Sequence, residues 1–469
     1  MEHLNSNQKM YIRQLVSRYE AMSQKETVSF QEETVFLQMI DFCHTANKNR
    51  LALRIADDAI AQHPFSVNLY LKKAYFLLDR HKIEESLVTV EQAELFAPQH
   101  FQIGLLHARL LALKGQHKKA LVVLSDIKIN ATTEEGSNLY LLEAQLYEDL
   151  GQYSKMFDAL RKSLSLNCSN TEGYEKMIWA TEYSQRYAES VKFHNRLLDR
   201  DAYNWRAWLN LGFAQEALEN YNEAIEAFEY AFAIDERCRA AYMEAGELHM
   251  LLGDYQRAQI VYENAIFNTS EDALILQKLG LCYEKQDNPH TAMHFYQRAL
   301  ELNANDSETY FRIGECYMTF GKWHRAIEVF ERATVINNRK EDYYVRLADA
   351  YWRTEQFGKA LSSFRKAALT APEDINCWLR YAGFLYSVGQ EKKALQVLQD
   401  AQNYVFDAQI EYCQIACLMS LGRRSEALYR LSEALAEDFD KHTALLNWRP
   451  DLAENSDFQN LINDYKPYR

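Results

Sequence analysis

The chain has 469 residues, of which 48% are apolar and 25% charged, with only 15 Gly and 6 Pro. These two turn-forming residues are well below their usual frequencies of about 7% and about 5%. Their scarcity argues against an all-β or loop-rich fold and predicts long helices with short connections. Lys plus Arg number 52 and Asp plus Glu 66, so the net charge of −14 disfavours binding along nucleic acid or an anionic membrane surface.

The chain carries no sign of a targeting or membrane-spanning segment. The segment Met1–Met10 lacks a basic region followed by an apolar run, and no apolar run of about 18 residues occurs. The 8 cysteines include no Cys-x-x-Cys pair and are too dispersed for a disulfide framework. We therefore expect a cytoplasmic protein with reduced, mostly buried cysteines.

The first predicted element is a helix over residues 8–22. Ile12, Leu15, Val16 and Tyr19 follow helical spacing and indicate one apolar face. Ser29 and Glu32 then have the spacing of a capping box before the next helix. We interpret residues 1–32 as an N-terminal cap.

From Glu33 onward the sequence repeats with a period of 34 residues. In the six units over residues 205–408 a small residue is followed by an alanine twelve residues later, a bulky residue four further on, and another alanine three further still; the upstream units follow these columns less cleanly. In the clearest units the small residues are Gly212, Gly246, Gly280, Gly314, Ala348 and Ala382, and the bulky ones Phe228, Tyr262, Tyr296, Phe330, Phe364 and Leu398. The spacing lengthens to 36 between Ala108 and Ala144, which predicts a two-residue insertion in a loop at Thr132–Gly136.

These columns resemble those of the tetratricopeptide repeat family. The sixth unit carries the family's order most fully, in Trp208, Leu211, Gly212, Ala224, Phe228 and Ala231. Tyr317 and Tyr351 match its tyrosine column, whereas the closing proline survives only at Pro64, Pro98 and Pro372. The resemblance implies antiparallel helix pairs stacked into a right-handed superhelix, with the first helix of each pair lining a concave groove.

The repeat and its two ends account for nearly the whole chain, so we expect one continuous all-α solenoid. Trp448, Arg449 and Pro450 interrupt the chain, and Ser456–Tyr465 predicts a last helix within a C-terminal cap at 439–469. The register divides residues 33–438 into twelve helix pairs. Each pair buries its apolar face only by stacking on the next, so the pairs should form one continuous stack. The units start near residues 33, 67, 101, 137, 171, 205, 239, 273, 307, 341, 375 and 409.

No pattern in the sequence points to catalysis. Phosphate-binding glycine loops, nucleophile elbows and zinc-ligand patterns are missing. His290 and His294 lie four residues apart but have no third ligand, and Cys413 and Cys417 read as a reduced, partly buried pair. We therefore expect no enzyme activity, metal or cofactor.

A helical wheel separates the predicted groove from the core. Numbering each unit from its first residue, positions 4, 7, 8 and 11 face the core, while 2, 6, 9 and 13 lie opposite, flanked by 5 and 12. In the family this opposite stripe faces the groove. Position 6 holds a series of cations that would suit a carboxylate-rich peptide: Lys278, Arg312, Arg346 and Arg380.

Acidic neighbours in the same helix change this interpretation for two of the arginines. Glu308 and Glu315 flank Arg312, and Asp342 and Asp349 flank Arg346, at spacings that form pairs within a helix. Arg380 has no such acids, and the neighbouring Gly383 leaves space beside it. We therefore expect Arg380 to be unpaired.

Aromatic residues on the same stripe suggest two binding patches. Trp352, Arg353 and Tyr386 are expected near Arg380, and aromatic residues with a free guanidinium are typical of interaction hot spots. The alternative is that the rings only pack between adjacent first helices. A second, apolar patch is predicted from Trp179, Phe213, Leu274 and Leu281.

The functional hypothesis is a scaffold or adaptor that holds a peptide segment of a partner protein in this groove. The clamp that some family members use for chaperone C-termini is disfavoured, because Glu175 and Trp179 precede Asn210, and Ala240 and Glu244 follow it, where the clamp needs Lys, Asn, Lys and Arg. An RNA-binding helical-repeat protein is the alternative. The acid-flanked arginines and the net charge speak against nucleic acid as a partner.

Overall fold

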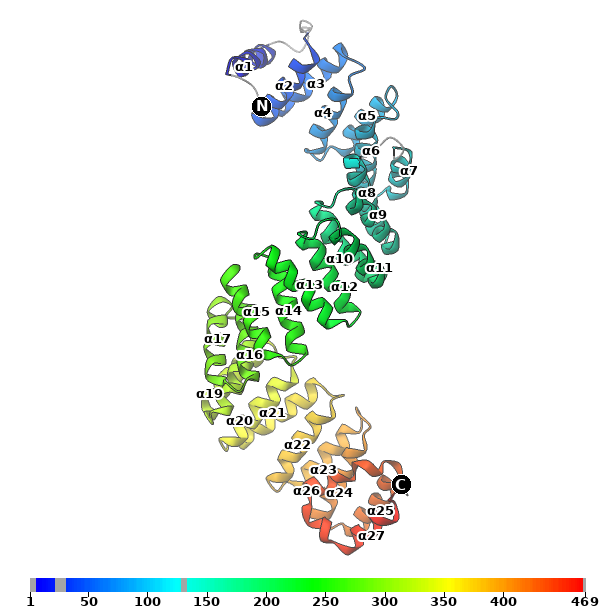
Figure 1. The fold of residues 1–469 in the computed structure, drawn as a ribbon. Coiled ribbons are helices and arrows are strands. Elements are labelled where there is room, and N and C mark those ends of the chain that lie inside the picture. The colour runs from blue at the N-terminus through cyan, green and yellow to red at the C-terminus, as the bar shows by residue number, and fades with distance from the viewer. Residues whose placement is uncertain (1–5, 22–30, 128–132, 467–469) are drawn as a thin grey trace. The chain divides into compact units, whose positions relative to one another are not determined.

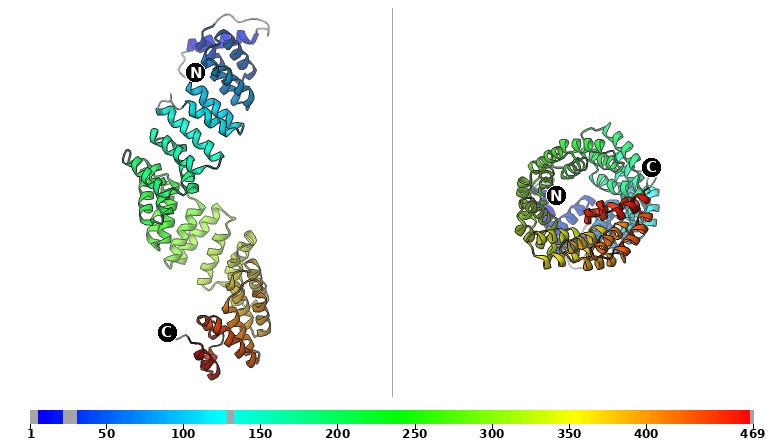
Figure 2. Two further views of the ribbon diagram at one scale, coloured as in Figure 1. Left: turned by 90° about the vertical axis from the view of Figure 1, so that its right-hand side faces the viewer. Right: turned by 90° about the horizontal axis from the view of Figure 1, so that it is seen from below.

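The computed structural model describes residues 6–21, 31–127 and 133–466, and all regular structure in these ranges is helical (Figure 1). The chain divides into two compact units, Met1–Asp235 and Glu236–Arg469. Within each unit the helices form successive pairs that lie side by side (Figure 2). The fold is an all-α solenoid, as the sequence predicts, whereas its continuity over residues 33–438 stays a prediction.

In unit 1 the even-numbered helices from α2 onward are the first helices of the pairs and the odd-numbered ones are the second. The helices of this unit are α1 (Ser6–Ala21), α2 (Glu33–Thr45), α3 (Asn49–Gln62), α4 (Val67–Leu78), α5 (Ile83–Glu94), α6 (Phe101–Leu113), α7 (His117–Ile127), α8 (Thr133–Asp149), α9 (Tyr153–Leu166), α10 (Thr171–Ser184), α11 (Tyr187–Leu198), α12 (Trp205–Ala217) and α13 (Tyr221–Ile234).

Unit 2 continues the same alternation up to α25 and ends in shorter helices. Its helices are α14 (Arg239–Leu251), α15 (Tyr255–Asn268), α16 (Ala273–Lys285), α17 (Pro289–Leu302), α18 (Ser307–Thr319), α19 (Trp323–Ile336), α20 (Glu341–Arg353), α21 (Phe357–Thr370), α22 (Ile375–Ser387), α23 (Glu391–Ala401), α24 (Ala408–Ser420), α25 (Arg424–Glu437), η2 (Phe439–His442), α26 (Thr443–Trp448), η3 (Pro450–Glu454) and α27 (Ser456–Asp464).

The two-residue insertion is accommodated by a helix, so the predicted loop at Thr132–Gly136 is wrong. Helix α8 begins at Thr133 and is 17 residues long, and Gly136 is buried inside it. Thr132 lies outside the described residues. The extra residues lengthen the first helix, which satisfies its own backbone hydrogen bonds where a loop would leave them to solvent.

The N-terminal helix covers the exposed end of the first pair. Ile12, Val16 and Tyr19 of α1 are buried against α2 and α3, and the Tyr19 hydroxyl lies 3.1 Å from the Asp58 carboxylate. Ser29 of the predicted capping box is outside the described residues. Glu32 is the N-cap of α2 and makes no side-chain cap hydrogen bond.

The C-terminal helices cover the last pair in a similar way. Leu445, Leu452, Phe458 and Ile462 are buried in one core with α24 and α25. These four anchors fix α26, η3 and α27 to the last pair. The end of unit 2 thus presents a covered face rather than an open apolar one, as a solenoid end requires.

All eight cysteines are free thiols, and seven of them are buried. Burial raises the pKa of Cys417 to about 12 and that of Cys413 further still. Thiols with raised pKa values are poor nucleophiles and poor metal ligands. In the described ranges no helix is both long and apolar enough to cross a bilayer.

The glycine column marks where the two helices of a pair touch. A Cβ atom on Gly212, Gly246, Gly280 or Gly314 would lie 2.3–2.6 Å from the bulky aromatic ring sixteen residues later. Such an approach is far inside van der Waals contact. Glycine at this position therefore sets the spacing within the pair and leaves the ring fully buried, as for Phe330 opposite Gly314.

We predict that Gly314→Ala lowers the free energy of unfolding by about 1–3 kcal/mol, because the added methyl group overpacks Phe330. Gly358→Ala is the matched control, since no atom lies within 4 Å of its added Cβ in α21. Urea denaturation followed by circular dichroism measures both. Equal stability of the two variants would contradict the packing account.

His194 occupies the bulky column of the fifth unit and is fully buried. Its Nδ1–H donates to the Ser190 carbonyl at 2.9 Å, which fixes the tautomer of the ring. Burial lowers the pKa of His194 from 6.5 to about 4. Between these values the unfolded chain binds the proton more readily, so protonation destabilises the folded state as the pH falls.

We predict that His194→Leu removes this pH sensitivity, since the same column holds Leu160 and Leu398 elsewhere. Relative to the variant, the wild type should lose about 2 kcal/mol between pH 7 and pH 5. Urea denaturation at both pH values provides the measurement. A stability difference that is the same at pH 5 and pH 7 would show that His194 is not the titrating group.

Candidate peptide-binding groove

Cations on one first helix pair with acids on the preceding first helix. Four pairs join position 6 of one 34-residue repeat to position 9 of the repeat before it, 31 residues earlier in the sequence. Lys278 lies 2.8 Å from Glu247, Arg346 3.2 Å from Glu315, and Arg380 2.9 Å from Asp349; Lys72 also pairs with Asp41. We call each such pair a rung.

Two further rungs use an acid at position 12 instead, 28 residues before the cation. Arg312 lies 3.5 Å from Glu284, and Lys176 lies 2.7 Å from Glu148. The eighth unit has Leu281 at position 9, so Arg312 uses the acid one helical turn further along α16. The rungs run along the stripe that the sequence assigns to the groove.

These rungs correct the prediction that Arg380 is unpaired. Its partner, Asp349, comes from α20 and is only 16% exposed, whereas the sequence argument considered acids of α22 alone. Burial raises the pKa of the Asp349 carboxyl, and the guanidinium groups of Arg380 and Arg346 oppose that shift. Asp349 therefore forms ion pairs with both Arg380 and Arg346.

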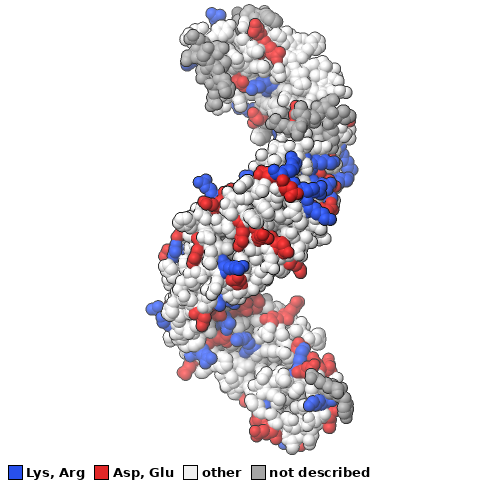
Figure 3. All heavy atoms as spheres, viewed as in Figure 1, with Lys and Arg blue, Asp and Glu red and all other residues white. Residues whose placement is uncertain are grey.

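The pairs predicted within helices are partly right. Arg312 does bind Glu308, with Nε 3.0 Å from Oε1, and Arg346 lies 3.9 Å from Asp349. Glu315 instead serves Arg346 of the next first helix. Basic and acidic groups accordingly lie next to one another over the visible face of each unit (Figure 3).

A pocket of about 520 Å³ brings four of the predicted site residues together in unit 2. Trp352 and Arg353 of α20 meet Arg380 of α22, and Arg346 lies beside them. The apolar part of this pocket was not predicted from the sequence. That part consists of Met318, Trp323, Phe364 and Phe384.

Trp352 is both packed and accessible, so the packing interpretation of its ring holds in part and a binding role stays a prediction. The indole meets the Phe384 ring edge-on with centroids 5.5 Å apart, yet 38% of the residue remains exposed. Across the pocket the Arg353 guanidinium lies 5.7 Å from the centre of the Trp323 ring. Among the described residues Arg353 forms no salt bridge, although its charge also opposes the raised pKa of the Asp349 carboxyl. It is the one of the three pocket arginines without a salt bridge.

Tyr386 does not line this pocket. Its ring packs against Trp448 with centroids 5.0 Å apart, and its hydroxyl lies 2.6 Å from the Ser420 hydroxyl. The Trp448 indole also lies 3.6 Å from where a Cβ of Gly383 would be, so it fills the space that was expected beside Arg380. The C-terminal cap thereby borders the pocket.

The predicted apolar patch is divided between the two units. In unit 1 Trp179 is 58% exposed and stacks on Tyr183 of its own helix, while Phe213 packs edge-on against Phe228. In unit 2 Leu274 is exposed and Leu281 half-buried. A binding role for these four residues stays a prediction.

Other sequence candidates have structural explanations. Asn210 is buried and donates to the Arg206 carbonyl at 3.0 Å, so its amide is committed within α12. His290 stacks on Phe320 at 4.2 Å. Within the described part of the chain no group of three or more His, Cys, Asp or Glu residues is placed to hold a metal ion.

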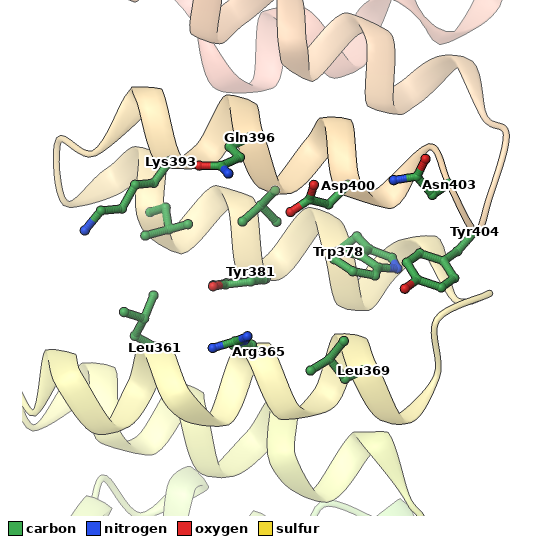
Figure 4. A pocket seen from close by; sticks show the side chains of 12 residues that line it. Leu361, Arg365, Leu369, Trp378, Tyr381, Lys393, Gln396, Asp400, Asn403 and Tyr404 are labelled. Carbon is green, nitrogen blue, oxygen red and sulfur yellow. The ribbon is translucent and has the colours of Figure 1, made fainter.

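A second pocket in unit 2, of about 350 Å³, lies between the second helices α21 and α23 (Figure 4). Helix α22 forms its floor through Tyr381 and Trp378, and Trp378 stacks on Tyr404 at 5.7 Å. Arg365 and Asp400 face each other across it.

Comparison with known proteins decides the family. One tetratricopeptide repeat model matches residues 236–405, and another matches 137–169 and 206–238. The chain is a tetratricopeptide-repeat protein. Repeats of this kind support a general role as a scaffold for protein–protein interaction.

Relatives of this tetratricopeptide-repeat protein match it over limited lengths. It is 25% identical to human cilia- and flagella-associated protein 70 over 190 residues, which cover 38% of this chain and 17% of that protein. The chain thus spans less than a fifth of that relative.

Similar solved structures share the fold alone. YrrB, described as a TPR protein with an unusual peptide-binding site, is 23% identical with a TM-score of 0.35, covering 39% of this chain and 95% of its own. MamA is 22% identical, with a TM-score of 0.33 and coverages of 34% and 94%. The APC/C hetero-tetramer Cut9–Hcn1 is 12% identical, with a TM-score of 0.37 and coverages of 84% and 96%.

We predict that Arg380 and Asp349 are energetically coupled. A double-mutant cycle with alanine at each position should give about 0.5–1 kcal/mol at low salt, and less at 1 M NaCl, because both groups are partly solvated. Arg325, which lies over the Tyr317 ring, is a matched control and should show no coupling to Asp349. A coupling of zero for Arg380 would mean that the rung contributes no stability.

Proposed function

We propose that this protein is a scaffold whose unit 2 holds a peptide segment of a partner in the pocket of Trp352, Trp323 and Arg353. The observation that carries the proposal is the combination of an accessible indole, Trp352, with a guanidinium that forms no salt bridge, Arg353, in one concave site. Such pairs of groups are enriched where binding energy concentrates in protein interfaces. The Arg380–Asp349 rung forms the adjoining rim.

The chemistry of the pocket defines the segment that it fits. The rings of Trp352, Trp323 and Phe384 offer an apolar surface for one large side chain of the partner. Arg353 offers five donors for a carboxylate next to that side chain. The proposed ligand is therefore an aromatic residue flanked by acids.

The rungs favour a protein ligand over the alternative of RNA. An RNA-binding groove needs cations that are free to replace counterions along the phosphate backbone. Here the position-6 cations, from Lys278 to Arg380, are paired with carboxylates. The groove of unit 2 consequently lacks the free basic stripe that RNA binding would require.

We predict that a labelled peptide with one phenylalanine between two aspartates binds the full chain, as measured by fluorescence anisotropy. Trp352→Ala and Arg353→Glu should each weaken binding about tenfold or more, because each removes a central contact. Arg339→Glu, at an exposed loop position outside the pocket, is a matched charge control and should have no effect.

The same assay tests the alternatives. A peptide with lysines in place of the aspartates should not bind. Equal binding by the wild type, Trp352→Ala and Arg353→Glu would refute the site, and tight, salt-sensitive binding of a single-stranded RNA oligonucleotide would favour the other function.

A further inference from the structure

Two successive steps of unit 1 lack a rung, as does the later step from Trp179 to Asn210. Position 9 holds Tyr75 and then Arg109, where intact rungs hold an acid, and position 6 of the following unit holds Leu106 and then Leu142, where intact rungs hold a cation. The step before these, Asp41 with Lys72, is intact. The groove stripe thus changes from paired charges to leucines across α4, α6 and α8.

A pocket of about 310 Å³ opens at these interruptions. Its apolar lining comes from Tyr75, Leu105, Leu106, Leu141 and Leu142. Leu106 is buried in the core, the other three leucines are half-buried, and Tyr75 is 40% exposed. The pocket therefore has a leucine floor beneath a tyrosine rim.

Arg109 is the cation of this pocket, and the interruption explains why it is uncommitted. It stands at position 9, where its counterpart across the step is Leu142 instead of an ion. In the described ranges Arg109 forms no ion pair, and its side chain is exposed. A carboxylate supplied by a ligand would complete the missing pair.

The polar residues of α8 indicate the conformation of that ligand. Asn138 and Gln145 line the same pocket and lie seven residues apart, a rise of about 10 Å along the helix. Three residues of an extended chain span about the same distance. Each side-chain amide both donates and accepts hydrogen bonds, which matches the free N–H and C=O groups of an extended backbone.

We infer that this pocket is a second peptide-binding site, which takes an extended segment with leucine-type side chains next to an acidic residue. The leucines would enter the pocket of Leu106 and Leu142, and the acid would pair with Arg109. This site stands independently of the proposed site in unit 2, with which it shares no residue. Glu172 also lines the pocket and would repel acids placed out of register.

The test uses a labelled octapeptide, with two adjacent leucines between two aspartates and Gly-Ser at each end, and the full chain. The decisive variant is the double substitution Arg109→Glu with Leu142→Lys, which restores the charge pattern of an intact rung. Because Lys72 and Lys176 occupy the same column, this variant is expected to fold as well as the wild type. Its melting curve checks that expectation.

We expect the octapeptide to bind the wild type and to lose at least about tenfold in affinity to the rung-restoring variant. Arg353→Glu in unit 2 should leave octapeptide binding unchanged. Replacing the aspartates by lysines, or the leucines by serines, should abolish binding.

Three results would overturn the inference. The first is unchanged affinity of the folded rung-restoring variant, and the second is equal binding of the lysine or serine peptide. The third is loss of octapeptide binding in Arg353→Glu alone, which would place the peptide in unit 2 and leave the proposed function intact. Conversely, failure of the phenylalanine peptide at Trp352 would not affect this site.

Discussion

The close contact between the two helices of each pair is the constraint on which the architecture depends. Gly212, Gly246, Gly280 and Gly314 bring the first helix against an aromatic ring of the second so closely that no side chain fits between them. This contact buries the core-facing residues of the first helix. Its opposite stripe is left facing outward, and that is where the rungs and the proposed sites lie.

The rungs give this outward stripe a regular chemistry. A cation at position 6 of a rung pairs with an acid on the preceding first helix. Such paired charges bind an acidic ligand weakly, because the acid of the rung competes with the ligand for the cation. Binding chemistry is concentrated where the pattern fails. In unit 1 the pattern fails at Leu106 and Leu142, and again at Asn210, which follows Trp179. In unit 2 an additional cation, Arg353, forms no rung.

The fold was predictable because its determinants are local and repeated. The 34-residue columns specify which residues touch within a pair, and the glycine–aromatic contacts follow from them. The insertion before Ala144 was misplaced because sequence spacing cannot distinguish a longer loop from a longer helix. The C-terminal cap was recognised, but the contact of Trp448 with Tyr386 joins residues that no repeat relates.

The site was predictable only in part. Arg346, Trp352, Arg353 and Arg380 do meet in one pocket. The error on Arg380 arose because pairing was judged within one helix, whereas Asp349 belongs to its neighbour. Spacings of 31 and 28 residues between an acid and a following cation are the sequence signal that identifies rungs, and their interruption at Tyr75 and Arg109 is the signal that identifies the second pocket.

We propose that peptides bind where a rung is missing, as at Leu106 and Leu142, or where an extra cation lies beside a rung, as Arg353 does. They are not expected to bind where rungs are intact. Photo-crosslinking of the full chain tests this proposal most directly, using the two acidic peptides with a diazirine analogue of leucine or phenylalanine and mass spectrometry of the labelled fragments. We expect labels on α4, α6 and α8 for the leucine peptide and on α20 and α22 for the phenylalanine peptide. Labels of equal intensity on α14 and α16, which the Glu247–Lys278 rung joins, would contradict the proposal.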